Sequence, residues 1–568
     1  MLSRSGVFAK ERVELSKDGG VFESGAEKRS HPVEIRSIRE SLGKGPILKE
    51  GEAGHFYSLA RTDGEAYVAR YDLVGSKMTS RPFVGESILR FVQLTDVQLA
   101  DTESPARFEY INRYFRDPKF TKLIPGFRAQ ETLVVALLIN FVEAINSIGA
   151  SEMTGAELDL VLTSGDATDN AQENELDAFL SILAGGVVRL KSKSTRYFGV
   201  QTQGVGDEFI WHPDPGKTDL YKDLFGHPTI EGLLDKAVSE TLSPGLRVPW
   251  IGCNGNHELL IQGVGIATQV AKEIALGNVK QILPGDIPMS GVEELFIERP
   301  EIFLTGGTSI EVASDPKRQI LDKEHLISAY LEAGGKPKGH GFKSENLRDK
   351  TAYFSYQPND KTTVIVLDTS HLKGAASGVL DNLQAKWLEE RLIEVHSNYL
   401  GRDGSMIKTE NQDRYVVLCS HHPLEEMDNS FAPIDGYLRG PEVQEILGRF
   451  PNLICWVAGH VHRNEIIARA SGHNSHWGYW EVVSSAVMDW PSQLRMCEIV
   501  DHGDGYLSIF TEMINNPAPL LPDESLDRGS LASIHRLLAA NAPSAGIDSD
   551  RLGKKTDRNT QLLLKARF

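Results

Sequence analysis

The sequence is poor in cysteine and has no long apolar run. Its four cysteines show no CxxC spacing, and three of them lie inside short apolar segments, so we expect buried thiols in a reducing compartment. No apolar stretch reaches the roughly 18 residues that a membrane span needs, and the first residues lack the apolar core of a signal peptide. These absences predict a soluble, cytoplasmic protein.

Positive charge is also scarce relative to negative charge. The chain has 60 Lys and Arg against 78 Asp and Glu, which gives a formal net charge of -18 at pH 7. Such a surface repels polyanions, so we expect neither extended nucleic acid nor an anionic membrane as a partner. With 568 residues and 40% hydrophobic content, the chain exceeds one ordinary domain and can bury a large core.

What the sequence does contain is five β-prone apolar segments that end in polar residues. They are residues 88–96 (ILRFVQLTD), 158–166 (LDLVLTSGD), 248–259 (VPWIGCNGNHEL), 414–422 (RYVVLCSHH) and 452–460 (NLICWVAGH). Ligand sites form at the carboxyl ends of strands that share a sheet, so we expect the polar residues at these ends to converge. These residues are Asp96, Gln98, Asp166, Asn256, His257, His421, His460 and His462.

The types of these residues favour a metal site over an organic one. Aspartate can bridge two cations, asparagine and glutamine offer amide oxygen, and histidine offers imidazole nitrogen. All of them except His257 could together supply two mixed N/O sites that share one carboxylate. Two divalent cations roughly 3.5–4 Å apart activate water and clamp a phosphoryl group during in-line displacement. His257 adjoins Asn256 and is the candidate to protonate the leaving oxygen or to stabilise transition-state charge.

The motifs resemble, in order, those of the calcineurin-like metallophosphoesterase superfamily, in the form of a bacterial-type stand-alone enzyme. That family has D-x-H, G-D, G-N-H-[DE], a histidine before x-Pro, and G-H-x-H. This chain has Asp96-Val97-Gln98, Gly165-Asp166, Gly255-Asn256-His257-Glu258, His421-His422-Pro423 and Gly459-His460-Val461-His462. The resemblance covers about residues 86–514 and implies an α/β fold, a four-layer α/β/β/α sandwich of two mixed sheets with large insertions.

The resemblance also implies how the ligands are shared between two divalent metal ions. One ion would be held by Asp96, Gln98, Asp166 and His462, and the other by Asp166, Asn256, His421 and His460. Of the two adjacent histidines, His421 matches the family ligand and His422 is expected behind it or in packing. Gln98 stands where the family usually has histidine, and its neutral oxygen favours Mn²⁺ or Mg²⁺ over Zn²⁺. Mn²⁺ is therefore the expected metal, with Fe, Zn²⁺ or Mg²⁺ as alternatives.

The function expected from these residues is a dinuclear metal-dependent phosphoesterase. It would hydrolyse a phosphate mono- or diester of a small soluble substrate through attack by metal-bound hydroxide, with His257, Asn256 and Asp166 as catalytic residues. Two alternatives stay open: a nucleotide or sugar-nucleotide pyrophosphatase on the same site, and a catalytically weak metal-binding interaction protein in which Gln98 has emptied one metal position. The sequence does not determine the oligomeric state.

The predicted organisation has three parts. Residues 1–85 are an N-terminal extension, residues 86–515 are the metallophosphoesterase domain, and residues 516–568 are a C-terminal tail. Two intervals inside the domain, about 185–246 and 263–350, are too long for simple loops and are expected to form caps or lobes.

Several smaller features are also predicted. Residues 131–148 have the apolar spacing of one broad helix face. Asp169 or Asn170 is expected to be the N-cap of the next helix. Residues 489–491 are expected at the mouth of the site, and Arg463 either touches phosphate or is merely exposed.

Overall fold

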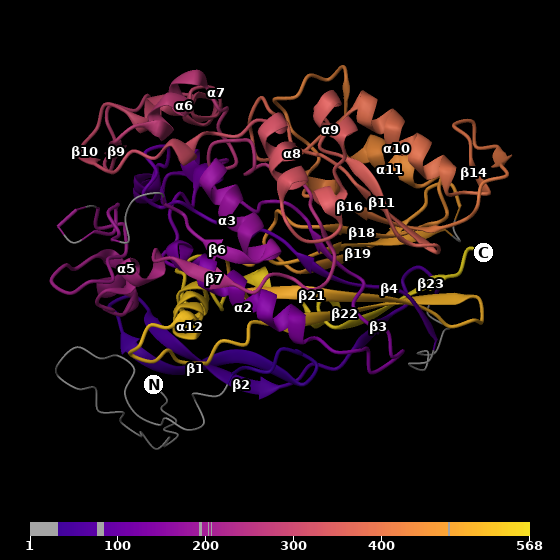
Figure 1. Cartoon of the computed structure of the whole chain (residues 1–568), viewed down its shortest axis with the longest axis horizontal. Helices are drawn as coiled ribbons and strands as arrows, with labels where there is room; N and C mark the ends of the chain where they lie inside the picture. Colours follow the sequence, from indigo (N-terminus) through magenta and orange to yellow (C-terminus); the bar gives the residue numbers. More distant parts are fainter. Residues whose placement is uncertain (1–31, 76–84, 192–195, 203, 206, 475–476) are drawn as a thin grey trace, which may run out of the picture.

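The fold is mixed α/β and contains two large sheets with helices around them (Figure 1). The computed structural model describes residues 32–75, 85–191, 196–202, 204–205, 207–474 and 477–568. No helix among these residues is both long and apolar enough to cross a membrane.

The first large sheet has seven strands and contains three of the five predicted segments. Its strands, in order across the sheet, are β3 (Val68–Arg70), β23 (Thr560–Lys565), β22 (Tyr506–Asn515), β21 (Gln493–Asp501), β4 (Glu86–Leu94), β5 (Leu160–Thr163) and β8 (Trp250–Ile251). The neighbours β4, β5 and β8 run parallel, whereas β21 is antiparallel to both β4 and β22. The carboxyl ends of β4, β5 and β8 therefore point the same way.

The second large sheet has six strands and contains the other two predicted segments. Its order is β11 (Phe354–Asn359), β12 (Thr362–Val366), β16 (Tyr415–Cys419), β18 (Leu453–Ala458), β20 (Gly478–Val483) and β19 (Glu465–Ala470). The four inner strands are parallel, and the edge strands β11 and β19 are antiparallel to their neighbours. Every residue of β12, β16, β18 and β20 is buried, which explains why these strands are apolar runs and do not alternate.

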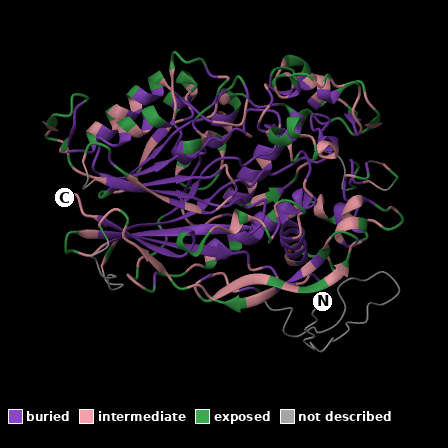
Figure 2. Ribbon diagram, turned by 180° about the vertical axis from the view of Figure 1, so that it is seen from behind, coloured by how far each residue is buried: buried purple, intermediate pink, exposed green. Residues whose placement is uncertain are grey.

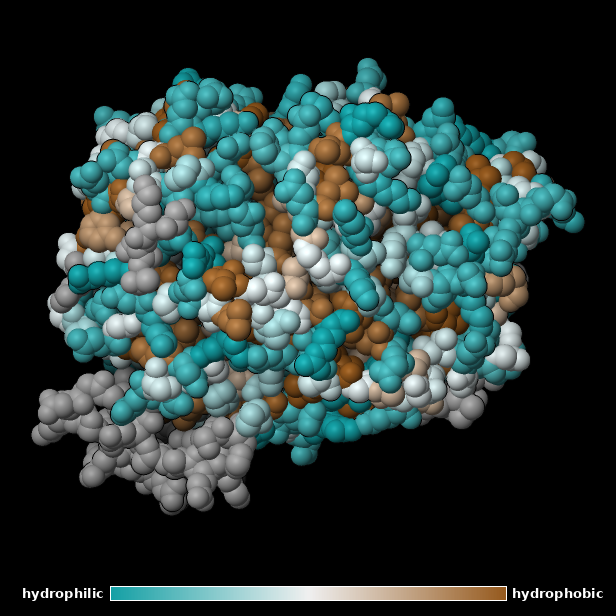
Figure 3. All heavy atoms as spheres, in the orientation of Figure 1, coloured by the Kyte–Doolittle hydropathy of each residue, from teal (hydrophilic) through white to brown (hydrophobic). Residues whose placement is uncertain are grey.

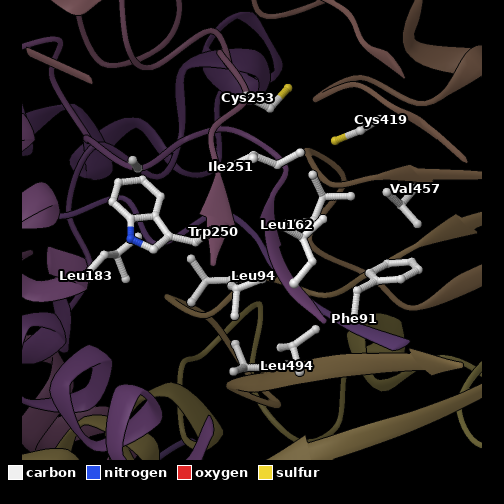
Figure 4. Packing of buried hydrophobic residues seen from close by; sticks show 14 of the residues in the cluster. Phe91, Leu94, Leu162, Leu183, Trp250, Ile251, Cys253, Cys419, Val457 and Leu494 are labelled. Atoms are coloured by element: carbon white, nitrogen blue, oxygen red, sulfur yellow. The ribbon is translucent and has the colours of Figure 1, made fainter. Parts of the chain in front are cut away.

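The main hydrophobic core joins the two sheets. Leu94 and Leu162 of the seven-stranded sheet belong to the same cluster as Cys419 and Val457 of the six-stranded sheet (Figure 4). The inner strands of the two large sheets are buried, while many of the helices around them expose part of their surface (Figure 2). On the face seen in Figure 3, hydrophilic residues predominate and hydrophobic ones lie in small groups. All four cysteines are buried and free, as expected.

Helices pack on both sheets. The predicted helix at 131–148 is confirmed as a short 3-10 turn followed by α2 (Val134–Ser147), which packs into the main core through Leu138 and Val142. The helices α10 (Asn382–Glu394) and α11 (Gly440–Leu447) pack on the six-stranded sheet. The helix α12 (Arg528–Ala540) lies against α2.

The described residues of the two long intervals form short elements and contribute no strand to either large sheet. The helix α3 (Glu173–Ala184) precedes the first interval. That interval contains β6 (Gly186–Val188), α4 (Leu220–Phe225), α5 (Leu233–Ala237) and β7 (Thr241–Ser243). The second contains α6 (Gln269–Leu276), β9 (Val279–Gln281), α7 (Val292–Glu298), β10 (Ser309–Glu311), α8 (Lys323–Glu332) and α9 (Ser344–Asp349). The remaining strands are the pairs β1 (Glu40–Glu50) with β2 (His55–Asp63), β13 (Leu380–Asp381) with β17 (Tyr437–Leu438), and β14 (Asn398–Leu400) with β15 (Met406–Lys408).

The segments predicted as an extension and a tail both contribute to the seven-stranded sheet. The strand β23 comes from the predicted tail and lies between β22 and β3, and β3 comes from the predicted extension. Residues 1–31 and 76–84 of that extension lie outside the described residues. The domain limits stay a prediction, and the segment predicted as the C-terminal tail, residues 516–568, contains the strand β23, which the sequence did not predict. The signal was weak because the leucines of β23 stand in a short run between charged and polar residues.

The burial of β23 predicts that it is needed for stability. Leu564 is 0% exposed in the main core, so Leu564→Ala should lower the free energy of unfolding by roughly 2–5 kcal/mol. Leu383 is 78% exposed, and Leu383→Ala should change it by less than about 0.5 kcal/mol. Urea unfolding followed by circular dichroism measures both, and equal small effects would contradict the integral role of β23.

Candidate metal centre

The polar residues that end the five segments come together where the two sheets meet. Asp96 follows β4, Asp166 follows β5, His421 follows β16 and His460 follows β18, each within three residues of the strand end. Ligand atoms of Asp96, Asp166 and His421 all lie within 4.8 Å of one another. Both sheets therefore contribute to one site, as the sequence predicts for converging strand ends.

The backbone at this site has an unusual conformation. Left-handed φ values occur at the non-glycine residues Asp96 (52°), Gln98 (45°), Asp166 (54°), His460 (71°) and His462 (54°). This conformation costs roughly 1–2 kcal/mol per residue. Such residues persist where surrounding structure holds them, and they gather at functional sites.

At two positions of the motifs, only glycine fits for steric reasons. A Cβ at Gly255 would collide with Asp166 Oδ1, and a Cβ at Gly459 would collide with Thr95 Oγ1 and Asp96 Oδ2. The strand ends thus approach the carboxylates more closely than any side chain at these positions would allow.

Each buried carboxylate faces a histidine nitrogen. Asp96 Oδ1 lies 3.2 Å from His462 Nε2, and Asp166 Oδ2 lies 3.1 Å from His421 Nε2. Burial alone would lower the pKa of His421, but Asp166 and Asp96 raise it to about 10. Burial would raise the pKa of Asp96, but His462 and His421 lower it overall. The carboxylates are therefore ionised and available to a cation.

The other ring nitrogens decide which nitrogen each histidine presents. His462 Nδ1 lies 2.7 Å from Asp489 Oδ2, and His421 Nδ1 lies 2.9 Å from Ser164 O. These contacts leave Nε2 of both rings facing the carboxylates, which is the arrangement that orients metal-binding histidines. His460 Nδ1 lies 3.2 Å from His421 Nε2, and burial together with His422 and His421 holds the pKa of His460 well below its usual value. His460 is therefore neutral, as a ligand must be.

The two amides leave their oxygens without a protein partner. Gln98 Nε2 lies 3.1 Å from His257 Nε2, and Asn256 Nδ2 donates to Gly263 O at 2.9 Å. Gln98 Oε1 and Asn256 Oδ1 are buried and accept no hydrogen bond from the described residues. A buried acceptor left unpaired costs about 1–3 kcal/mol, so both oxygens fit a site that binds a cation. The donor set of carboxylate, amide and imidazole groups suits divalent metal ions.

His422 lies beside this site but is not available to a metal. It belongs to a second possible group with His421 and His460. However, its Nδ1 lies 2.7 Å from Thr369 Oγ1 and its Nε2 lies 2.7 Å from Ala376 O. Both ring nitrogens are occupied, which agrees with the choice of His421 as the ligand.

Asp169 does not cap a helix, and that prediction was wrong. The helix α3 begins at Glu173 with Gln172 as its N-cap residue, so neither Asp169 nor Asn170 caps it. The side chain of Asp169 is paired with buried Arg107. Its carbonyl oxygen lies 2.6 Å from His257 Nδ1 and accepts a hydrogen bond from that ring nitrogen. Asp169 thus fixes the ring of His257 with Nε2 directed to Gln98.

Asp489 lies behind His462 and not at the mouth of the site. It is only 3% exposed, and besides His462 Nδ1 it accepts from Arg551 Nη1 at 2.6 Å. Arg128 Nε lies 3.3 Å from its other oxygen. Burial would raise the pKa of Asp489, but Arg128, Arg551 and His462 hold it well below its usual value. Sequence reasoning missed Arg128 and Arg551, because isolated arginines far from the apolar segments give no signal.

Arg463 is an exposed residue. Its guanidinium pairs with Asp550 and Glu465, and its side chain is 39% exposed. These partners agree with the simpler of the two predictions for Arg463, namely that it is merely exposed.

Comparison with known proteins adds no assignment to this site. No family model matches the chain, and no curated protein matches its sequence. The chemistry of the site therefore rests on its own geometry.

The position of Asp489 predicts an effect on metal affinity. Asp489→Asn should weaken Mn²⁺ binding by roughly 10- to 100-fold, because residues that orient a metal-binding histidine have effects of that size. Asp403→Asn, at an exposed turn, is the matched control and should leave affinity unchanged. Calorimetric titration of the metal-free protein measures both, and unchanged affinity in Asp489→Asn would remove it from the site.

Proposed function

We propose that this chain is a metal-dependent phosphoesterase of the calcineurin-like superfamily, which hydrolyses a phosphate mono- or diester of a small soluble substrate. The observation that carries the proposal is the pair of buried amide oxygens, Gln98 Oε1 and Asn256 Oδ1, left without partners among ionised carboxylates and histidines. The mixed α/β fold with two large sheets supports the finer proposal of a four-layer α/β/β/α sandwich.

In this proposal seven side chains hold two divalent ions, most favourably Mn²⁺. They are Asp96, Gln98, Asp166 and His462 for one ion, and Asp166, Asn256, His421 and His460 for the other. Two such ions would lower the pKa of water and offset the charge of a phosphoryl group. Asp166 suits the shared position because it lies within reach of both Asp96 and His421.

His257 would move the proton in the reaction. Its Nδ1 is held by Asp169 O, so Nε2 faces the site, 3.1 Å from Gln98 Nε2 and 3.9 Å from Asp166 Oδ2. Its side chain is 14% exposed, whereas both carboxylates of the site are buried. His257 can therefore meet a substrate that enters from solvent, and when its ring carries a proton on both nitrogens it can pass the one on Nε2 to the leaving oxygen.

The alternative of a weak binding protein depends on an empty position at Gln98. The side-chain contacts of Gln98 weaken that alternative, since its nitrogen is engaged by His257 and its oxygen remains available as a ligand. The pyrophosphatase alternative uses the same residues and differs only in substrate.

The role of His257 predicts a loss of turnover without a loss of metal. His257→Ala should lower kcat by roughly 100- to 10,000-fold, the usual contribution of a general acid, while metal content stays near two ions per chain. His325→Ala is the control, since His325 is half exposed on α8. Chromogenic phosphate monoesters and diesters and a nucleotide-sugar anhydride, assayed with Mn²⁺, measure turnover and separate esterase from pyrophosphatase.

The outcomes of that assay are distinct. Hydrolysis of the anhydride alone would favour the pyrophosphatase. No turnover of any substrate, with fewer than two ions bound and no rescue by Gln98→His, would favour the binding protein.

The pKa of His421 predicts that metal binding depends on pH. Its pKa is about 10 in the metal-free protein, so the ring is protonated at neutral pH and must lose a proton to bind metal. Mn²⁺ affinity should therefore rise as pH rises from roughly 6 to 8, by up to about tenfold per unit. Calorimetry in buffers of different ionisation enthalpy measures the proton release, and an affinity independent of pH would contradict this.

A further inference from the structure

A second cavity lies at the other end of the six-stranded sheet. It has a volume of about 390 Å³ and lies between the edge strand β11, the helix α10 and the residues around the 3-10 helix η6 (Lys338–Gly341). Figure 1 shows α9, α10 and β11 close together in this part of the molecule. The volume is in the range of sites for small molecules.

The cavity is separate from the candidate metal centre. Arg414, which lines the cavity, stands just before the first residue of β16, and His421 stands two residues after the last. Seven residues of extended chain span roughly 20 Å, at about 3.3 Å per residue. A molecule in this cavity would therefore not touch the proposed metal ligands.

The charge of the lining is positive, although the chain as a whole is strongly acidic. Four cations line the cavity, and Glu394 is the one acidic residue among its lining residues. Arg391 pairs with Glu394 at 2.7 Å. The cations are Lys338, Lys343, Arg391 and Arg414. The positive net charge of this lining contrasts with the formal net charge of -18 of the whole chain.

Three of the four cations of this cavity lack a side-chain partner among the described residues. Arg414, Lys338 and Lys343 make no side-chain hydrogen bond or ion pair with any residue that the structure describes. The Nε atoms of Arg391 and Arg414 are buried and likewise donate to no described residue. Buried guanidinium N–H groups left without an acceptor favour the binding of an anion.

The walls of the cavity suit an organic ligand as well as an anion. Phe342 and Val395 are buried beside it, and Tyr356 of β11, which is half buried, also lines it. Apolar and aromatic walls with a few converging polar groups are typical of sites for small organic molecules.

From these observations we propose that this cavity, the basic cavity, is a second binding site that takes a small phosphorylated molecule. Its cations bind the phosphate group, and its aromatic wall contacts the organic part. The limited volume and the acidic remainder of the surface exclude a polyanion such as nucleic acid.

The test uses the full-length chain in EDTA, so that no metal-bound phosphate at the other site contributes. Sodium pyrophosphate and adenosine 5′-monophosphate are titrated by calorimetry into the wild type, Lys338→Gln/Lys343→Gln and a control. The control, Lys350→Gln/Lys361→Gln, removes the same charge from two exposed lysines outside the cavity lining. The lysines tested are exposed, so the fold should be retained.

We expect saturable binding to the wild type and the control, and binding about tenfold or more weaker in Lys338→Gln/Lys343→Gln. Arg414→Met should weaken the binding of both probes by as much and should leave the metal affinity unchanged. Tighter binding of adenosine monophosphate than of pyrophosphate supports a role for the aromatic wall. No saturable binding of either probe to the wild type, or equal weakening in the control, would overturn the proposal.

Discussion

Two negative charges buried side by side constrain the rest of this structure. Asp96 and Asp166 are 0% and 1% exposed, and each would be costly without compensation. The surrounding elements supply it: His462 and His421 face the carboxylates, the backbone N–H of His460 donates to Asp96, and that of His257 donates to Asp166. The glycines and left-handed residues at the strand ends are the backbone changes that bring these groups close enough.

The sequence predicts the central sheets and most of the candidate ligands because their signals are local. Strands buried on both faces must be apolar runs, and each run ends within a few residues of its ligand. Other contacts have no such signal. Asp489 and Arg551 meet His462 only after the chain folds, and Asp169 resembles a helix cap, although Arg107 engages its side chain. The strand β3 lies inside residues 66–73, which have a weak strand pattern, whereas β23 was missed because its six residues carry little periodicity.

Gln98 links the candidate metal centre to the proposed proton donor. Its amide nitrogen lies against His257, and its oxygen has no hydrogen-bond partner among the described residues. The orientation of His257 therefore depends on Gln98 at one ring nitrogen and on Asp169 at the other. Arg128 lies 3.8 Å from Asp169 and 3.3 Å from Asp489, so the proposed acid and His462 share one buried charge network.

The pairing of β3 with β23 has a consequence for biosynthesis. Among the described strands, β3 pairs only with β23, and almost the whole of the fold separates them in the sequence. A ribosome translates β3 early and β23 late. During translation β3 must wait without its neighbour while both large sheets emerge, and a nascent chain with an unpaired edge is exposed to aggregation. Chaperones that bind such edges would therefore act on this chain before its last strand is made.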